Sequence, residues 1–400
     1  NEVKEQFAVP RRTEIVEWSG DMEDEDLIER EDMVVTVTSG GYIKRTPLID
    51  FRAQRRGGKG LAGMQTKDED VVTTLFVANT HTQLLFFTTD GMAYKLKTWR
   101  LPLGGRTAKG KAIVNILPIP VGVSIAAIMP VDVEEKEWDN LQIIFATSAG
   151  DVRRNALSDF TNVRSNGKIA MDLNEGIELV NARIAGEDDD VMLFTDSGRA
   201  IRFSTTAVRV FKGRKSTGVR GIKLLGTDKV VSMSVIRHFI ATPDERSAYL
   251  KMRRAVSGLV DEEASSDEEE VSENATISPD RYAEMSAAEN LILTITAGGA
   301  GKLSSSHDYP VRGRGGMGVA AMDKTMRGGA IVASFPVELE DQIMLATSNG
   351  QSIRVPIEGI SFRSRSAGGV KVFDTKESEE VVSVAWIADQ GDDTEEDSED

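Results

Sequence analysis

The sequence predicts an all-β fold of six blades with four strands each, closed into a propeller-like array. Two observations predict it: one β-hairpin recurs six times along the 400 residues, and no helical pattern separates the strands within a unit. The 36 glycines and 11 prolines supply the many turns that short strands require. Parallel α/β folds are excluded, because their successive strands need a helical crossover between them.

Each copy of the hairpin has an apolar strand ending near a threonine, a turn ending in glycine, and a strand that carries Lys or Arg. The copies are VVTVTSGGYIKR (34–45), LLFFTTDGMAYK (84–95), IIFATSAGDVRR (143–154), VMLFTDSGRAIR (191–202), LILTITAGGAGK (291–302) and IMLATSNGQSIR (343–354). We expect two-residue type I′ turns, most clearly at Asp90-Gly91 and Asn349-Gly350, because both central residues of that turn need φ > 0. The turn glycines are Gly41, Gly91, Gly150, Gly198, Gly299 and Gly350.

A second glycine lies 17 to 20 residues after each turn glycine and stands among basic residues. These glycines are Gly60, Gly110, Gly167, Gly218, Gly318 and Gly369. An apolar strand follows each of them, then a polar turn, and then a β-rich strand that we expect at the outer edge of the blade. The copies of this last strand are TTLFVA, AAIMPV, LVNARI, VVSMSV, IVASFP and VVSVAW.

One interval between turn glycines is twice the normal length, which predicts an insertion at 237–290. Thr242-Pro243-Asp244-Glu245 indicates a capping box, and Ser278-Pro279 indicates a second helix start. The segment DEEASSDEEE between them is too charged to be buried, so we expect two short helices around a disordered acidic loop.

The domain boundaries follow from the repeats and from the acidic segments. We expect a linker from an absent N-terminal part (1–32), the six-bladed domain (33–388) and an acidic tail (389–400). Because the chain begins with Asn1, we expect a fragment of a longer protein.

The formal charge of −16 would ordinarily argue against nucleic acid as a partner. Three runs, 21–32, 261–273 and 389–400, carry a net charge of −23, so the other residues have a net charge of +7. The body of the protein is therefore mildly basic.

Basic residues gather in the loops around the second glycines. In a closed ring these loops share one rim, and a curved cationic rim is typical of proteins that bend a polyanion. The rim residues are Arg52, Arg106, Lys109, Lys111, Arg164, Lys168, Arg214, Lys215, Arg220, Lys223, Arg312, Arg314, Arg363, Arg365 and Lys371.

The first of these loops contains Gln54, Arg55, Arg56, Gly57, Gly58, Lys59 and Gly60. This heptapeptide, QRRGGKG, resembles the signature box of the C-terminal domain of the DNA gyrase A protein, and the six repeats extend the resemblance over the whole chain. The resemblance implies a six-bladed β-pinwheel that wraps DNA on its outer edge, with residues 54–60 as the box and the other basic loops as the continuing path. The fifth unit departs from the box, since Met317 stands where the box has Lys.

As the resemblance implies, this chain is a non-catalytic part of an ATP-dependent type II topoisomerase, an isomerase that introduces negative supercoils. Its partners would be double-stranded DNA, the N-terminal domains of gyrase A, and gyrase B in an A2B2 heterotetramer. ATP and Mg²⁺ would bind to other domains, with no cofactor in this chain. The location would be the bacterial cytoplasm, at the nucleoid.

Three alternatives remain beside this interpretation. A topoisomerase IV-type arm is disfavoured by the intact box, and a protein-interaction propeller would need a basic or aromatic top face. An independent enzyme is the weakest, because Ser306-His307-Asp308 are adjacent and cannot form a triad, and because three histidines without cysteine give little basis for a metal site. The Gly313-x-Gly315-x-x-Gly318 pattern opens no helix, so it predicts no dinucleotide site. We therefore expect no catalytic residues, no metal and no membrane segment.

Overall fold

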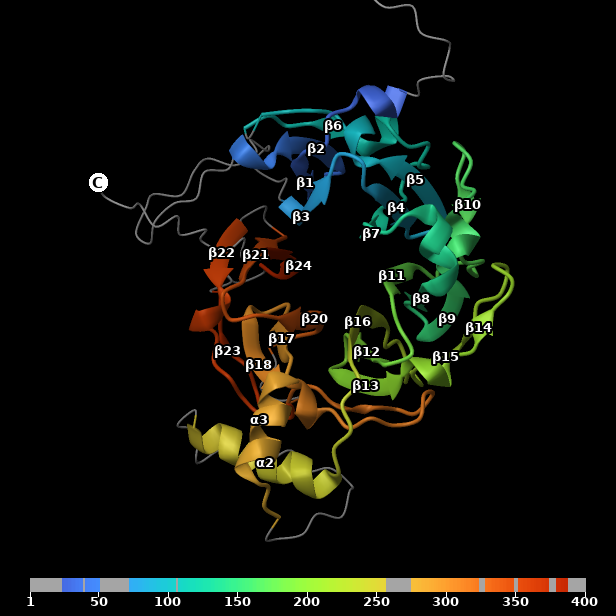
Figure 1. Ribbon diagram of the computed structural model, residues 1–400. Helices are drawn as coiled ribbons and strands as arrows, with labels where there is room; N and C mark the ends of the chain where they lie inside the picture. The colour runs from blue at the N-terminus through green and yellow to red at the C-terminus, as the bar shows by residue number, and fades with distance from the viewer. Residues whose placement is uncertain are drawn as a thin grey trace, which may run out of the picture.

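The computed structural model describes residues 24–38, 40–50, 72–105, 107–256, 275–323, 328–348, 352–373 and 379–387. Six small sheets stand in a ring around a central axis, in the order in which they occur along the chain (Figure 1). The predicted six-bladed all-β fold is therefore confirmed. The box, Gln54–Gly60, lies outside the described residues, as do Arg52, Arg106 and the acidic segment of the insertion.

One strand of each sheet faces the centre of the ring (Figure 1). These inner strands are β3 (Val72–Asn79), β7 (Ile125–Val131), β11 (Leu179–Ile184), β16 (Val230–Arg237), β20 (Ile331–Val337) and β24 (Val381–Ile387). The prediction that these strands lie at the outer edge is wrong. Their small side chains, such as Ala182 and Ser334, suit positions where neighbouring sheets converge.

The recurring hairpin forms the middle of each sheet. Its first strands are β1 (Asp32–Thr38), β4 (Gln83–Thr88), β8 (Gln142–Thr147), β12 (Asp189–Thr195), β17 (Leu291–Thr296) and β21 (Gln342–Thr347). Its second strands are β2 (Tyr42–Pro47), β5 (Met92–Lys97), β9 (Asp151–Ala156), β13 (Arg199–Ser204), β18 (Ala300–Ser305) and β22 (Ser352–Pro356).

The outermost strand of a sheet comes from the following unit. These two-residue strands are β6 (Lys111–Ala112), β10 (Lys168–Ile169), β15 (Val219–Arg220), β19 (Val319–Ala320) and β23 (Val370–Lys371). Thus β6 pairs with β2 and β10 pairs with β5, so each unit from the second to the sixth gives a short strand to the sheet before it. A further short strand, β14 (Val210–Phe211), runs parallel to β9 in the third sheet. The sixth sheet contains β22, β21 and β24 within the described ranges.

The hairpin turns differ from the predicted two-residue type. In the second unit the amide of Gly91 donates to the carbonyl of Thr88 (2.9 Å), so Thr89 and Asp90 are the central residues of a turn that Gly91 completes. Gly91 has φ +80°, which makes the connection a three-residue loop ending in a glycine bulge. The same hydrogen bond recurs in four other described hairpins, so the prediction of type I′ turns is wrong for these five. The predicted turn at Asn349-Gly350 lies outside the described residues.

The hydrophobic core lies between neighbouring blades. A group of three phenylalanines joins the second and third blades, where the ring centroid of Phe87 lies 5.4 Å from that of Phe145 and 5.6 Å from that of Phe160. All three side chains are fully buried. Neighbouring blades therefore stabilise one another by burying apolar side chains between them.

The insertion lies at the outside of the ring beside β18 (Figure 1). It contains the two predicted helices, α2 (Pro243–Val256) and α3 (Pro279–Ala287). The capping box is present, since Thr242 and Glu245 exchange backbone-to-side-chain hydrogen bonds of 2.8 and 3.2 Å. His307 packs edge-on against Tyr249 of α2, and its Nε2 lies 2.8 Å from the Met285 carbonyl oxygen of α3, which fixes the insertion to the fifth blade.

Short 3₁₀ helices occupy many of the connections. They are η1 (Asp24–Leu27), η2 (Leu48–Asp50), η3 (Thr98–Arg100), η4 (Ile113–Asn115), η5 (Glu135–Asn140), η6 (Leu157–Phe160), η7 (Thr205–Ala207), η8 (Ser306–Asp308) and η9 (Ile357–Gly359).

Candidate nucleic-acid interface

The sheet order places four predicted rim residues at the perimeter of the ring. Lys111 lies in β6, Lys168 in β10, Arg220 in β15 and Lys371 in β23, and each of these strands is the outermost of its sheet or pairs with its second hairpin strand. Equivalent loops of successive units therefore do share one edge of the molecule, as the repeats predict.

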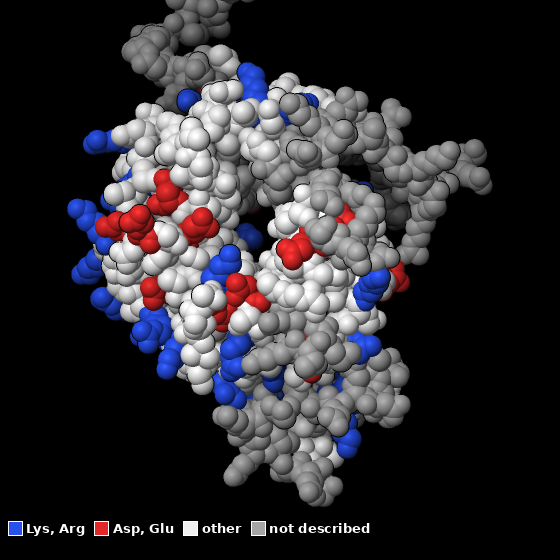
Figure 2. Space-filling view, turned by 180° about the vertical axis from the view of Figure 1, so that it is seen from behind, with Lys and Arg blue, Asp and Glu red and all other residues white. Residues whose placement is uncertain are grey.

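Most described rim residues are accessible to solvent. Those classed as exposed are Lys111, Arg164, Lys215, Arg220, Lys223, Arg314 and Lys371. Those that are half-buried are Lys109, Lys168, Arg214, Arg312 and Arg363. Figure 2 shows Lys and Arg along the left outline of the molecule, the side of β10, β14 and β15 in Figure 1, while many Asp and Glu lie inward of that outline.

Arg365 is a correction to the predicted rim. Its side chain is only 2% exposed. Its Nε donates to the carbonyl of Asp308 (2.7 Å), and a terminal nitrogen donates to the carbonyl of Ala320. Arg365 therefore joins the loop of the sixth unit to the fifth and has no surface to offer a ligand.

Neighbouring rim loops are hydrogen-bonded to one another. Arg214 donates to the carbonyl of Ile169 in β10 (3.1 Å), and Arg314 donates to the carbonyl of Arg220 in β15 (3.1 Å). The amide of Gly315 also donates to Gly221 (2.6 Å). The loops of the third, fourth and fifth units thus form a connected edge.

The cations of this edge are close enough to affect one another. Burial, and next the nearby Arg214 guanidinium, lower the pKa of Lys168. Lys109 lies over the ring of Tyr42, with 3.9 Å from Nζ to the ring centroid. An anionic ligand would relieve the repulsion between such cations, so the edge is suited to a chain of phosphates.

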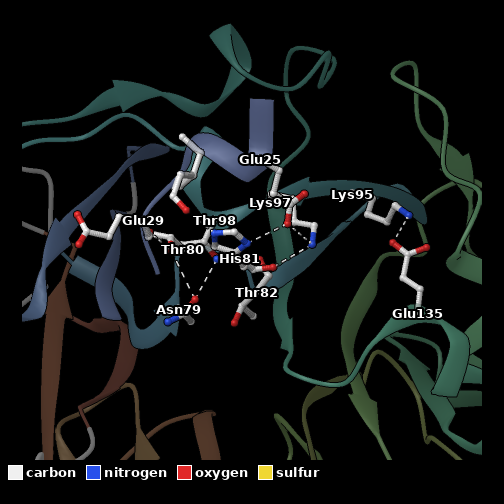
Figure 3. Close-up of polar contacts among 11 residues, drawn as sticks. Glu25, Glu29, Asn79, Thr80, His81, Thr82, Lys95, Lys97, Thr98 and Glu135 are labelled. Carbon is white, nitrogen blue, oxygen red and sulfur yellow. Dashed lines mark hydrogen bonds and ion pairs between the residues drawn. The ribbon is translucent and has the colours of Figure 1, made fainter. Parts of the chain in front are cut away.

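A second charged region lies at the start of the described chain (Figure 3). A cavity of 350 Å³ there is lined by residues that include Glu25, Arg30, His81, Lys97 and Asp132. Its charges are mixed, so it does not favour a polyanion.

This region attaches the segment 24–31 to the ring. Nε2 of His81 lies 2.8 Å from the carbonyl oxygen of Ile28, and Nδ1 lies 3.2 Å from the Glu25 carboxylate. Lys97 of β5 pairs with the same carboxylate at 3.0 Å (Figure 3). The hairpin pattern alone does not reveal this attachment, because Glu25 lies in an acidic run that is typical of a solvated linker.

The rejected enzyme motifs have structural roles. Ser306, His307 and Asp308 form η8, and the imidazole of His307 is buried against the insertion. Gly313–Gly318 lies between η8 and β19, where the described chain forms no helix. Within the described ranges, no three His, Cys, Asp or Glu side chains are grouped to hold a metal ion. No helix of that same part combines the length and apolar character needed to span a bilayer.

A protein-family comparison matches all six units of the chain. The family is described as "DNA gyrase C-terminal domain, beta-propeller", and its model matches residues 32–79, 82–132, 142–185, 189–237, 290–338 and 341–385. These ranges coincide with the inner strand and hairpin of each sheet.

Curated relatives match almost the whole chain. The DNA gyrase A protein of Rickettsia bellii is 44% identical over 399 residues, which cover 99% of this chain and 44% of that protein. The gyrase A protein of Granulibacter bethesdensis is 46% identical over 394 residues, covering 96% of this chain and 42% of the relative. The chain thus spans less than half the length of these relatives.

Solved structures share the fold. The C-terminal domain of DNA topoisomerase IV matches with a TM-score of 0.64 and 22% identity, over 90% of this chain and 94% of that one. A DNA gyrase A C-terminal domain matches with a TM-score of 0.61 and 21% identity, over 89% and 100%. At these identities the likeness concerns the fold alone.

Proposed function

Since the chain belongs to the DNA gyrase C-terminal β-propeller family, we propose that it binds double-stranded DNA along its outer edge and bends it around the ring. The single observation that carries this proposal is the cationic outer edge, where Lys111, Arg220 and Lys371 are exposed on outermost strands of different sheets.

In such binding, the cost of bending DNA is balanced against the gain from releasing counterions. Bending 20–30 bp of DNA by 40–90° costs about 1–6 kcal/mol. Each neutralised phosphate releases counterions, with a slope of about −0.9 in log K against log salt, so several rim contacts offset that cost at low salt. Phosphate contacts carry no base code, so sequence preference is weak.

In the whole protein, this domain serves as a non-catalytic arm. The bent DNA is presented to the strand-passage machinery of a gyrase A2B2 assembly, whose N-terminal gyrase A domains cleave DNA and whose gyrase B proteins hydrolyse ATP with Mg²⁺. A wrap of positive handedness makes strand passage introduce negative supercoils. The site of action is the cytoplasmic chromosome of a bacterium.

The box, Gln54–Gly60, starts the DNA path in this proposal. Its glycines allow close approach of the backbone, its arginines present planar forks to phosphate, and Lys59 adds a point charge. The other rim loops continue the path around the edge.

Topological footprinting tests the proposal. A nicked circular plasmid is incubated with the chain, ligated and deproteinised, and its linking-number distribution is measured. We expect a shift relative to protein-free ligation that grows with protein concentration and declines with salt.

The role of the box is tested with the triple variant Arg55→Ala/Arg56→Ala/Lys59→Ala in full-length gyrase. The enzyme that carries this variant should lose supercoiling activity and keep relaxation or decatenation activity. An unshifted linking number with the unaltered chain would refute DNA wrapping, whereas normal supercoiling by the triple variant would refute only the role of the box. Salt-insensitive binding to a protein, without a linking change, would favour the interaction-module alternative.

A further inference from the structure

In the first five units, the third residue after the turn glycine lies directly beneath a rim loop. In the odd-numbered units this residue is a cation: Lys44, Arg153 or Lys302. All three, which we name the base cations, are buried, with exposures of 1%, 0% and 0%. The sequence places them on the hairpin strand, and the fold turns them under the loop that the next unit contributes.

Lys302 shows the arrangement most fully. Its Nζ donates to the carbonyls of Ser364 (2.9 Å) and Ala367 (2.7 Å) in the loop of the sixth unit. That loop leads into β23, which pairs with β18, the strand that carries Lys302. One ammonium group therefore bonds to at least two backbone carbonyls of the loop and holds it from its buried side.

Arg153 has the same relation to the fourth unit. One terminal nitrogen donates to the carbonyls of Arg214 and Ser216, both at 2.6 Å. The loop passes so close that a Cβ on Gly218 would lie 3.0 Å from Cβ of Arg153 and 2.2 Å from the carbonyl oxygen of Val152. Burial lowers the pKa of Arg153 to about 10, so the guanidinium stays charged at neutral pH.

Lys44 repeats the contact in the first unit, where its Nζ donates to the carbonyl of Gly105 (2.9 Å). The neighbouring residues of that loop include the predicted rim cations Lys109 and Lys111. Three separate units thus place a buried positive charge against loop carbonyls.

The second and fourth units show that the fold does not require a charge at this position. Tyr94 fills it in the second unit, where its hydroxyl donates to the carbonyl of Pro118 (3.2 Å), and Ile201 fills it in the fourth. Both side chains are 3% exposed. An apolar or aromatic residue is sufficient to fill the space, so packing alone does not explain Lys or Arg.

We propose that Lys44, Arg153 and Lys302 are positioning residues for DNA binding, each holding one rim loop from its buried side and supplying a positive charge beneath it. This inference rests on the proposed function. A charge buried under the loop is poorly screened by salt, so it raises the potential at the loop surface without touching a phosphate.

The test compares Lys302→Met, which removes the charge, with Lys302→Arg, which keeps it. Binding of the chain to a linear DNA duplex is measured by fluorescence anisotropy at low salt, and amide hydrogen exchange is followed in residues 364–369. Lys44→Met and Lys44→Arg repeat the comparison in another unit, and urea titration identifies conditions in which every variant is folded.

We expect each Met variant to bind DNA about three- to tenfold more weakly and the Arg variants to recover the affinity. Exchange at residues 364–369 should rise in Lys302→Met and return towards the unaltered rate in Lys302→Arg. Tyr94→Phe, which removes a hydroxyl bond without a change of charge, is the matched control and should keep its DNA affinity.

Unchanged affinity in both Met variants would overturn the inference while leaving DNA binding itself established. Equal losses of DNA affinity in the Met and Arg variants would overturn it as well, because the positive charge beneath the loop would then not contribute to binding. Failure of the unaltered chain to bind DNA refutes the proposed function instead, and the exchange comparison still decides whether Lys302 holds its loop.

Discussion

Nε of Arg365 lies 2.7 Å from the carbonyl oxygen of Asp308, 57 positions earlier in the chain. The Asp308 carboxylate also accepts from the backbone amide of Arg365 (2.6 Å), so the two residues hold each other at both main chain and side chain. This pairing explains why a basic residue of a rim loop is buried.

Arg365→Ala is expected to lower stability rather than DNA binding. Removal of the guanidinium leaves buried acceptors of Asp308 and Ala320 without this donor, which costs about 3 kcal/mol. Chemical denaturation measures the loss. Lys371→Ala, at an exposed rim position, is the matched control and should leave the unfolding midpoint nearly unchanged. Equal stability of the two variants would contradict the assignment of Arg365 to the interior.

The exposed rim cations should each contribute to the salt dependence of DNA binding. For Lys371→Ala, Lys111→Ala or Arg220→Ala, the slope of log K against log salt should fall in magnitude by about 0.9 for each phosphate that the variant no longer neutralises. Arg237 is also exposed but belongs to the inner strand β16, so Arg237→Ala should keep the full slope. A similar change at Arg237 would show that DNA does not follow the outer edge.

Gly91→Ala should be strongly destabilising. The residue has φ +80°, and a Cβ there would lie 2.2 Å from the carbonyl oxygen of Met171. Left-handed backbone strain and the backbone clash together cost about 2–4 kcal/mol. At Gly359 a Cβ meets nothing within 4 Å and φ lies outside the left-handed range, so Gly359→Ala should change the unfolding midpoint little. Thermal unfolding of both variants gives the comparison.

Asp196→Asn should stabilise the protein at neutral pH. Burial, followed by the adjacent Asp228 carboxylate, raises the pKa of Asp196, so the folded state binds its proton more tightly than the unfolded chain. Stability contributed by this group therefore falls as pH rises through its raised pKa. The amide removes the charge, and its advantage should shrink as pH is lowered towards the ordinary range of an aspartate. Urea titrations at neutral and acidic pH test this, with exposed Asp188→Asn as the control; a pH-independent difference would contradict it.

His81→Ala should release residues 24–31 from the ring. The imidazole contacts both the Ile28 carbonyl and the Glu25 carboxylate, and neither acceptor keeps that partner in the variant. Amide hydrogen exchange in 24–31 should rise about tenfold, while the blade cores keep their protection. His238→Ala removes a different histidine–carboxylate pair, with Asp190 in the fourth blade, and should leave exchange in 24–31 unaffected. Unchanged exchange in His81→Ala would show that the contacts of Lys97 with Glu25 and of Thr80 with Glu29 and Glu31 are sufficient to hold the segment.

The sequence was sufficient to predict the number of blades, the hairpins and both insertion helices, because these depend on local patterns. Turn glycines and the Thr242–Glu245 capping box are local signals of that kind. The edge strand after each polar turn was placed at the wrong edge of its sheet, because its β-rich sequence marks a strand without showing which edge of the sheet faces the centre of the ring.

Interactions between distant residues set the remaining differences at the rim. Arg363 and Arg365 belong to the same short basic stretch, yet only Arg365 is fully buried, because it donates hydrogen bonds to the carbonyls of Asp308 and Ala320. Likewise, Lys302 is one of several cations on the hairpin strands, and its place under the next loop follows from the exchange of β23. Such pairings require knowledge of which sheet receives each short strand.

The pairing of a short strand from one unit with the preceding sheet constrains the order in which the sheets are completed during synthesis. When a ribosome has released β1, β2 and β3, the first sheet still has an open edge, and β6 reaches it only after the second hairpin has emerged. Assembly therefore advances from one end with a temporary unpaired edge that moves forward by one blade at each step. A chain cut between units retains that edge permanently, and it can be closed by the corresponding strand of another molecule, which makes early termination a route to intermolecular joining.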